Sequence, residues 1–361
     1  MTKTARKHSK TSWKKFQSDG QQKKRLYLGL IVLGVIVITV LLGKVLSFVG
    51  ALGQPFSPDG ESTGRSHLWN FISPINLIIK SDKVSLLSYN PSSKSLTIVK
   101  IPDETYLQAS LGYGKWPARS IYQLGQTEGK KIGAELLKLT ITETMGVPID
   151  GYLVFQGDSS NKGVDAIVED LRSSPFTTLG MISDIKTDLS LWELLRLIME
   201  VRGVRFDKID NKDLSQSQTT SWTLLSDGRR ALEINQSLLD KELGSYLIDE
   251  SLSLEGISVA IYNSTDHPKL AEKAARVVTN MGGRVVLTSV IKPRLEDSVI
   301  IGSSSYSYTR LGKIFAPNCF KKSCKDQIAK ISEENNSLKT LPETQLTIIL
   351  GEDYYKKYNN L

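Results

Sequence analysis

Histidine and cysteine are scarce in this chain, which holds three histidines and two cysteines among 361 residues. His8, His67 and His267 lie far apart, so a zinc site built from neighbouring ligands is excluded. Two cysteines also exclude a disulfide-dense secreted scaffold. Cys319 and Cys324 are close enough to form a short-loop disulfide in an oxidising compartment, with a pair of free thiols as the alternative.

Two common catalytic motifs are also missing. Gly125, Gly129 and the pair Gly282-Gly283 lack the G-x-G-x-x-G spacing of a dinucleotide site, and we interpret them as packing and capping glycines. The triple serine at 303–305 has no histidine placed nearby by a motif, which disfavours a serine nucleophile. Neither nucleotide-dependent nor serine-hydrolase chemistry is predicted.

The excess of positive charge is confined to the N-terminus. The chain has 46 basic and 38 acidic residues, and residues 1–25 alone hold nine basic residues and one acidic residue, Asp19. The remainder is balanced, with 37 residues of each sign. This balance disfavours a nucleic-acid-binding body, because such a domain carries its charge on the folded part. We interpret the tail as an orientation signal attracted to anionic lipid, with nucleic-acid binding by the tail as the weaker alternative.

A long apolar run follows the tail. Leu26–Val49 is 24 residues long, and Lys44 is its only charged residue. As a helix rising about 1.5 Å per residue it would extend roughly 36 Å, enough to cross a bilayer. A cleaved signal peptide is the competing interpretation, but its apolar core is about 7–15 residues long and Val49-Gly50-Ala51 is a weak cleavage site. We predict a single-pass helix at 26–49 in the cell membrane, with the tail in the cytoplasm and the body outside it.

The body is predicted to begin after a linker at 50–65 that is rich in glycine, proline and serine. Strand and helix patterns alternate in two parts, 66–215 and 254–361, which a connector at 216–253 separates. Asp188 is expected to cap the helix predicted at 189–201. In the first part, strands are predicted at 75–79, 84–89, 96–101 and 152–155, and helices at 120–145 and 189–201.

The second part shows the same alternation over about 105 residues, which indicates a small α/β domain. The predicted fold class is therefore α/β, with a single N-terminal transmembrane helix followed by two extracytoplasmic α/β domains. In this part, strands are predicted at 257–262, 284–290, 299–301 and 347–350, and helices at 268–281 and 306–315.

Both parts resemble one family of envelope proteins. Gly256–Leu361, with IYNST, KLAEKAARVVTNMGGRVV and a closing TIILGEDY, resembles the C-terminal domain of LytR-type proteins. Three upstream segments resemble the transferase domain of the LytR-CpsA-Psr family. They are Asp82–Leu107, Met145–Gly157 and Ser183–Leu197.

The resemblance implies a domain that moves a glycopolymer from a lipid pyrophosphate carrier to the cell wall. Arginines clamp the pyrophosphate in that family, and acidic residues hold a metal ion, usually Mg²⁺. Where the family has Ser-Ile-Pro-Arg-Asp-Thr, residues 100–105 read Lys-Ile-Pro-Asp-Glu-Thr. Asp103 thus stands at the arginine position and Glu104 at that of the acid. Asp82 matches a second acid, and Lys80 replaces an arginine before it.

The resemblance also supplies a set of candidate site residues. Asp82 and Glu104 are the candidate metal ligands, and Lys80 is the candidate contact to pyrophosphate. Arg119 and Arg172 are the candidate replacements for the missing arginine. Because an aspartate facing pyrophosphate would repel it, we interpret the first domain as a degenerate relative of the transferases.

The favoured hypothesis is a non-catalytic envelope protein that docks wall polymer, carrier lipid or an envelope protein. The alternative is an active LytR-CpsA-Psr-type phosphotransferase that attaches glycopolymer from a polyprenyl-linked precursor to the wall. No cofactor is expected for the first, and Mg²⁺ for the second. Tyr354, Tyr355 and Tyr358 could contact glycan or belong to a solvated tail.

The charge asymmetry around 26–49 generates a topology prediction. In intact cells, a thiol reagent that does not cross membranes should label a cysteine introduced at Ser62 but not one introduced at Ser12, because positively charged flanks stay in the cytoplasm. Labelling is read by mass shift of the purified chain. Labelling of the cysteine at position 12 in intact cells would contradict the predicted orientation.

Overall fold

The computed structural model describes residues 68–127, 131–173, 184–225, 228–321 and 344–359, together with Leu33 and Thr39. The chain divides into two compact units, Met1–Gln54 and Pro55–Leu361, and the elements below belong to the second. Among these residues no helix has the length and apolarity that a bilayer crossing requires. The predicted tail, span and linker lie outside the described residues, apart from Leu33 and Thr39.

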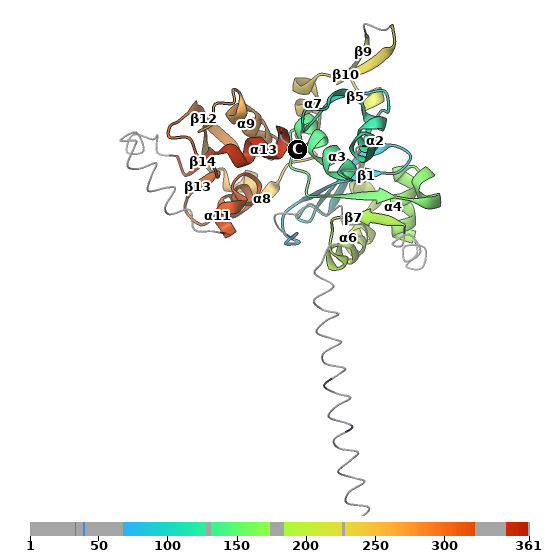
Figure 1. Ribbon diagram of the computed structural model, residues 1–361. Helices are drawn as coiled ribbons and strands as arrows, with labels where there is room; N and C mark the ends of the chain where they lie inside the picture. The colour runs from blue at the N-terminus through green and yellow to red at the C-terminus, as the bar shows by residue number, and fades with distance from the viewer. Residues whose placement is uncertain are drawn as a thin grey trace, which may run out of the picture. The chain divides into compact units, whose positions relative to one another are not determined.

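The first main sheet has six strands in the order β7-β6-β1-β2-β3-β8. Its strands β1 and β7 are labelled in Figure 1. β2 is antiparallel to β1 and β3, whereas β6 is parallel to β1 and β8 is parallel to β3. The four strands predicted in this part are confirmed. The sheet consists of β1 (Ile75–Lys80), β2 (Val84–Asn90), β3 (Ser95–Ile101), β6 (Gly151–Phe155), β7 (Ile185–Thr187) and β8 (Ile209–Asp213).

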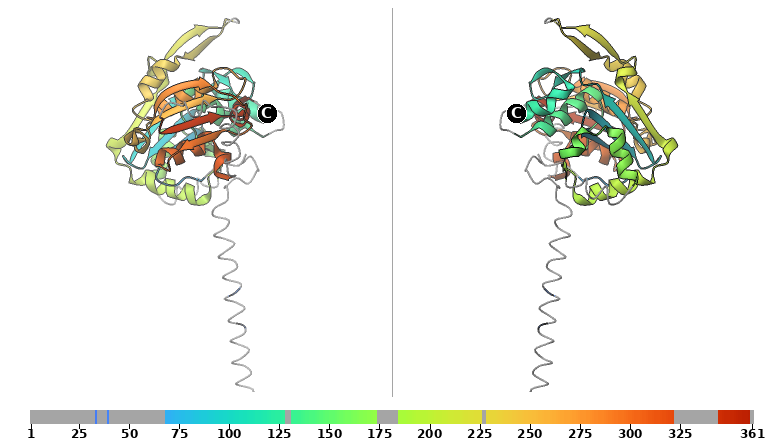
Figure 2. Two further views of the ribbon diagram at one scale, coloured as in Figure 1. Left: turned by 90° about the vertical axis from the view of Figure 1, so that its left-hand side faces the viewer. Right: turned by 90° about the vertical axis from the view of Figure 1, so that its right-hand side faces the viewer.

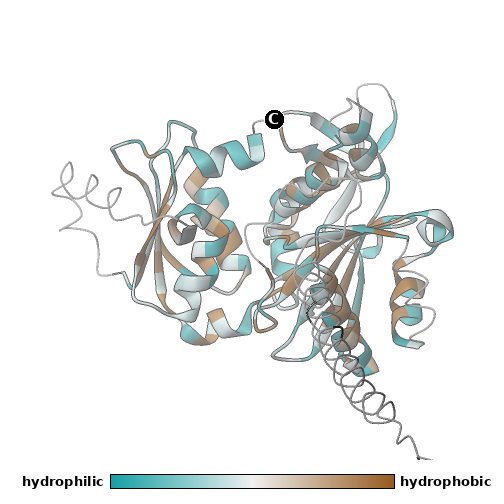
Figure 3. Cartoon of the chain, turned by 60° about the horizontal axis from the view of Figure 1, so that its bottom comes forward, coloured by the Kyte–Doolittle hydropathy of each residue, from teal (hydrophilic) through white to brown (hydrophobic). Residues whose placement is uncertain are grey.

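Helices cover both faces of this sheet. Successive residues of a strand point to opposite faces, so Leu77 and Ile79 join the core under α4 and α6, whereas Ile78 joins the core under α2, α3 and α7. The inner strands β1, β2 and β6 are accordingly buried along nearly their whole length, and hydrophobic residues concentrate in the sheet (Figure 3), whereas β8 at its edge is polar. The helices are α2 (Ala118–Thr127), α3 (Gly133–Met145), α4 (Val164–Ser173), α6 (Leu191–Gly203) and α7 (Gln236–Leu243), with short 3₁₀ turns η1 (Gly157–Asn161), η2 (Phe206–Lys208) and η3 (Leu214–Gln216).

The predicted helix at 120–145 is wrong as a single element, because the structure has α2 and α3 there. The two helices pack where Gly125 meets Gly133: a Cβ atom on Gly125 would lie 2.6 Å from the Cα atom of Gly133. Ile132 also donates its backbone N–H to the Gly125 carbonyl, at 3.1 Å. The glycines that weaken the helical pattern are therefore those that let two helices approach closely.

The N-cap of α6 also differs from the prediction. Ser190, not Asp188, caps the helix in a capping box: its hydroxyl accepts from the Glu193 N–H, and the Glu193 carboxylate accepts from the Ser190 N–H at 2.9 Å. Asp188 is buried and accepts the Tyr152 N–H at 2.9 Å, so its carboxylate is committed to the neighbouring strand.

The predicted connector at 216–253 contains ordered elements. β9 and β10 form a hairpin, and Leu232 of β10 donates its N–H to the Glu104 carbonyl at 3.0 Å. A second hairpin, β4–β5, follows β3 and leads into α2. These strands are β4 (Tyr106–Ala109), β5 (Gly114–Pro117), β9 (Thr220–Leu224) and β10 (Arg230–Ile234).

The second main sheet has four strands in the order β12-β11-β14-β13, which lie side by side in Figure 2. β11 is parallel to β12 and β14, and helices α9 and α10 contribute to the core on one face. All the predicted strands and helices of this part are confirmed. The elements are α8 (Glu250–Glu255), β11 (Ser258–Asn263), α9 (Leu270–Asn280), β12 (Arg284–Val290), β13 (Val299–Gly302), α10 (Tyr306–Phe315), α11 (Pro317–Lys321), β14 (Leu346–Leu350) and α13 (Glu352–Asn359).

The C-terminal tyrosines belong to α13. Tyr354 and Tyr358 are buried in the core of the second sheet, so a solvated tail is the wrong interpretation for them. Tyr355 stacks on His267 with 3.2 Å between ring centroids. Cys319, on α11, is disulfide-bonded. Cys324, the only other cysteine of the sequence, lies outside the described residues, so the pairing of the two stays a prediction.

Candidate functional site

The carboxyl ends of four strands meet at one edge of the six-stranded sheet. Because β6 is parallel to β1, β8 is parallel to β3 and β2 runs the opposite way between them, these four strands point in one direction. They end at Lys80, Phe155, Ile101 and Asp213. Ligands of open α/β sheets bind at such an edge, where the loops that follow the strands converge.

Charged side chains of both signs gather at this edge. Asp103 interacts electrostatically with Glu104, Lys83, Lys80 and Arg119, and Lys80 interacts with Asp82 as well. Four of the predicted site residues are thus brought together, and Lys83 is added to them. We call the group the sheet-edge cluster; it consists of Lys80, Asp82, Lys83, Asp103, Glu104 and Arg119.

Asp103 is unfavourably placed in this cluster. Burial raises the pKa of its carboxyl group, and the nearby Glu104 carboxylate raises it further, while three cations act in the opposite direction without cancelling the effect. Within the described part of the chain, the buried Oδ1 atom of Asp103 has no hydrogen-bond partner. A carboxylate therefore occupies this position at a cost in desolvation.

Lys80 and Asp82 are held by the turn between β1 and β2. The Lys80 ammonium donates to the Ser81 carbonyl at 2.6 Å, and Asp82 accepts the Lys83 N–H at 2.7 Å and the Ser81 hydroxyl at 3.1 Å. Burial lowers the pKa of the Lys80 ammonium, and Asp103 and Asp82 oppose that change. Hydrogen bonds within this short turn therefore hold both side chains in place.

Arg172 does not join the cluster. Gly163, which precedes α4, borders Asp82, since a Cβ atom there would lie 3.9 Å from the Asp82 Oδ2 atom. Arg172 is nine residues further along α4, roughly 13 Å at about 1.5 Å per residue. Its guanidinium donates to the Val204 carbonyl at 2.8 Å. Arg172 thus ties α4 to the end of α6.

The candidate metal ligands are two carboxylates, Asp82 and Glu104. In the parts of the chain that the structure describes, no group of three or more histidine, cysteine, aspartate or glutamate side chains could hold a metal ion. Oxygen-rich sites for Mg²⁺ with few protein carboxylates rely on phosphate and water for the remaining ligands. The residues present would therefore hold Mg²⁺ only together with a bound phosphate.

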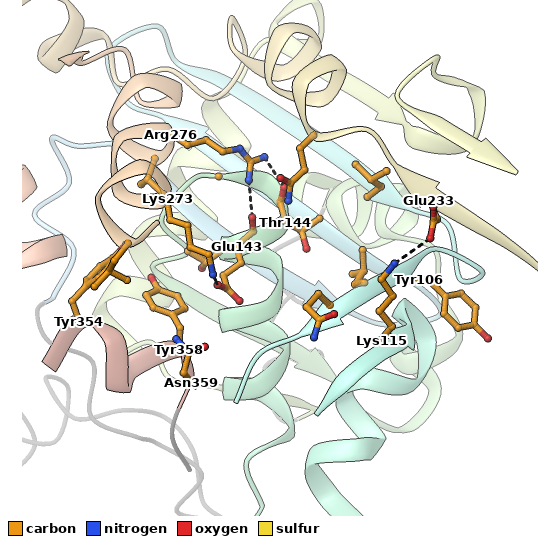
Figure 4. A pocket seen from close by; sticks show the side chains of 18 residues that line it. Tyr106, Lys115, Glu143, Thr144, Glu233, Lys273, Arg276, Tyr354, Tyr358 and Asn359 are labelled. Atoms are coloured by element: carbon orange, nitrogen blue, oxygen red, sulfur yellow. Dashed lines mark hydrogen bonds and ion pairs between the residues drawn. The ribbon is translucent and has the colours of Figure 1, made fainter. Parts of the chain in front are cut away.

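Sequence reasoning missed a cavity of about 440 Å³ outside the sheet-edge cluster, which we call the α3–α9 cavity (Figure 4). Its walls come from α3, α9, α13, the β4–β5 hairpin, β10 and the start of α7, so no local motif could have signalled it. Its volume lies in the range of pockets for small ligands.

The charges around the α3–α9 cavity are matched in pairs. Lys273 contacts Glu143 at 2.9 Å and Lys115 contacts Glu233 at 3.2 Å (Figure 4). Arg276 donates to both Asp240 oxygens at 2.7 Å and to the carbonyls of Glu143 and Thr144 at 2.8 Å. Each of the three cations that line the cavity is thus paired with a carboxylate; Glu143 and Glu233 line the cavity as well, whereas Asp240 does not.

The remaining polar groups of the cavity suit a neutral polar ligand. The side-chain amides of Gln108 and Gln236 line it, both residues are exposed, and neither amide has a partner among the described residues. Each amide offers two donors and an acceptor. Tyr106, Tyr354 and Tyr358 add aromatic wall beside the aliphatic side chains. Together these groups can hydrogen-bond a ligand and stack on its apolar faces.

Comparisons with known proteins agree with the resemblance drawn from the sequence. Over 170 residues the chain is 25% identical to the polyisoprenyl-teichoic acid–peptidoglycan teichoic acid transferase TagU of Oceanobacillus iheyensis. The match covers 41% of this chain and 52% of the relative, so the chain spans about half the length of the curated relative. The resemblance to the LytR-CpsA-Psr family is thereby confirmed.

Solved structures of lower similarity were found as well. Bacillus subtilis TagT is 13% identical with a TM-score of 0.34, covering 53% of this chain and 98% of TagT. A LytR-CPS2A-psr family protein, YwtF (TagT) with bound octaprenyl pyrophosphate lipid, is 14% identical with a TM-score of 0.34, covering 54% of this chain and 95% of its own. No protein-family model matches the chain.

The raised pKa of Asp103 generates a prediction about stability. At neutral pH the ionised carboxylate disfavours folding; well below the ordinary aspartate pKa of about 3.9 the group is protonated in the folded and unfolded states, and the difference vanishes. Asp103→Asn should therefore raise the free energy of unfolding of residues 55–361 at pH 7, and the gain should disappear at low pH. Urea titrations at several pH values measure this.

The matched control is Asp207→Asn, at a residue whose side chain is 58% exposed beside Arg205. Its stability should follow that of the parent chain at every pH. A pH-independent gain in the Asp103 variant would contradict the assignment of a strained carboxylate.

Proposed function

We propose that the protein is a membrane-anchored cell-envelope protein that docks wall glycopolymer without transferring it. The observation that carries the proposal is the charge of the sheet-edge cluster. Three carboxylates, with Asp103 at the arginine position of the resembled family, face three cations. A pyrophosphate needs a surplus of cationic donors, and this edge has none among the six residues of the cluster.

Two further points support an envelope ligand. The similar protein of Oceanobacillus iheyensis is named as a transferase of teichoic acid to peptidoglycan. The predicted span and the basic tail before it would hold the body at the outer face of the cell membrane. Wall glycan, carrier lipid and envelope proteins are the partners within reach there.

We assign glycan docking to the α3–α9 cavity. A neutral glycan has hydroxyl groups that pair with amides and carboxylates, and apolar ring faces that pack on tyrosine. The cavity offers the amides of Gln108 and Gln236, tyrosine rings, and cations that are each paired with a carboxylate. A polyanionic polymer would gain nothing from these paired charges.

Glycan docking can be tested by co-sedimentation with peptidoglycan stripped of anionic polymers. Residues 55–361 should sediment with it, and the double variant Gln108→Ala/Gln236→Ala should bind about thirtyfold more weakly, since each of two lost hydrogen bonds contributes roughly 1 kcal/mol. Gln216→Ala, at an exposed glutamine outside the cavity, should bind like the parent. Equal binding by all three chains would remove the cavity from the proposal.

Phosphotransfer is the second candidate function, because Lys80, Lys83 and Arg119 do converge near Asp103. We expect that residues 55–361 with Mg²⁺ neither hydrolyse nor transfer a polyprenyl-pyrophosphate-linked glycan, as followed by chromatography of the labelled glycan. The physical reason is repulsion by Asp103. Turnover that requires Mg²⁺ and is lost in Asp82→Ala would establish the transferase instead.

A further inference from the structure

Helix α6 presents an apolar stripe that no described element covers. Trp192, Leu195 and Met199 follow each other at helical spacing and are 56%, 38% and 62% exposed. The opposite side of the helix is buried in the core of the six-stranded sheet through four aliphatic residues, Leu194, Leu197, Ile198 and Val201. A helix at the surface of a soluble domain carries polar side chains on its outer face. α6 therefore has apolar side chains on both sides.

Aromatic and basic residues continue this surface beyond the helix. Phe206, in η2, is 85% exposed. Arg196 and Arg205 have exposed side chains, paired with Glu200 at 2.6 Å and Asp207 at 3.0 Å, and Lys208 is exposed as well. Tryptophan, phenylalanine and aliphatic residues interleaved with cations are the composition of segments that lie in a lipid interface.

The chain enters the folded body at this helix. Trp69, the second residue described after the linker, donates its backbone N–H to the Glu193 carboxylate at 2.6 Å. Phe71 lies under the Arg196 guanidinium, which is 5.9 Å from the ring centroid. The predicted span ends at Val49, so the 19 residues of 50–68 separate it from Trp69.

The length of chain before Trp69 limits how far α6 can lie from a bilayer that holds the predicted span. Nineteen residues reach at most about 65 Å even when fully extended. The local concentration of bilayer surface at α6 is therefore high, so that a weak contact is enough to hold it there. Because Trp69 contacts Glu193, α6 is the helix that the chain reaches first after the linker.

We propose that the outer face of α6, formed by Trp192, Leu195 and Met199 and continued by Phe206, rests on the surface of the lipid bilayer. The apolar side chains enter the headgroup boundary, and the Lys208 ammonium faces anionic headgroups. The contact would orient the folded body on the membrane. This inference rests on the predicted span but is independent of whether the α3–α9 cavity binds glycan.

The test uses the full chain reconstituted into vesicles of phosphatidylethanolamine and phosphatidylglycerol. A fluorophore is attached to Met199→Cys or, as the matched control, to Leu254→Cys on α8, where Leu254 is 86% exposed. Labelling is done without reductant, because Cys319 is disulfide-bonded. Lipids with a spin label near the headgroup should quench the fluorophore at position 199 at least about twofold more strongly than the fluorophore at position 254.

A second variant separates lipid contact from other causes of quenching. Trp192→Glu/Leu195→Glu in the Met199→Cys chain should lower the quenching to the level of position 254, while circular dichroism shows an unchanged fold. Equal quenching at 199 and 254 in the parent chain would overturn the proposal. A third outcome is that position 199 is not quenched by lipid but is shielded from a water-soluble quencher, and that this shielding increases with the number of protein molecules per vesicle. That outcome would also overturn the proposal and indicate that a second copy of the chain covers α6.

Discussion

The buried guanidinium of Arg310 is the interaction on which the arrangement of the folded region depends. Its side chain is 6% exposed and contacts Asp150 at 3.3 Å, Asp249 at 3.5 Å and the Pro74 carbonyl at 3.2 Å. These partners precede β6, α8 and β1, so one side chain of α10 joins both main sheets. A buried charge is tolerated only when it is matched, and this requirement fixes the position of α10.

Arg276 makes a second connection of the same kind, and it shapes the α3–α9 cavity. The last turn of α3 has carbonyl groups without helical partners and a partial negative charge. Arg276 of α9 satisfies the carbonyls of Glu143 and Thr144 while binding Asp240 of α7. The matched charges around the cavity are thus a consequence of how α9 is attached to α3 and α7.

The sheet-edge cluster and the α3–α9 cavity differ in the kind of ligand that their charges suit. At the sheet edge, four strands that run in one direction bring their loops together. Asp103 lies among the cations there and removes the surplus of positive charge that phosphate binding needs. The cavity has paired charges and exposed amides, which suit a neutral ligand. The α6 surface has a different character again, with exposed apolar side chains next to cations.

Local sequence predicted the inner strands of the first main sheet, all four strands of the second, and helices α6, α9 and α10, because alternation and helical spacing record which side chains face a core. The two hairpins, the edge strands β7 and β8 and the remaining helices were not predicted. The family resemblance singled out Glu104, which follows β3 next to Asp103, and Arg119, a candidate from a position that does not align with the family, also lies within electrostatic range of Asp103. Only the tertiary structure decided that Arg172 ties α4 to α6, that Asp188 serves a strand, and that two helices replace one at 120–145. Each of these depends on a partner or a packing contact outside the local pattern, which periodicity and spacing do not encode.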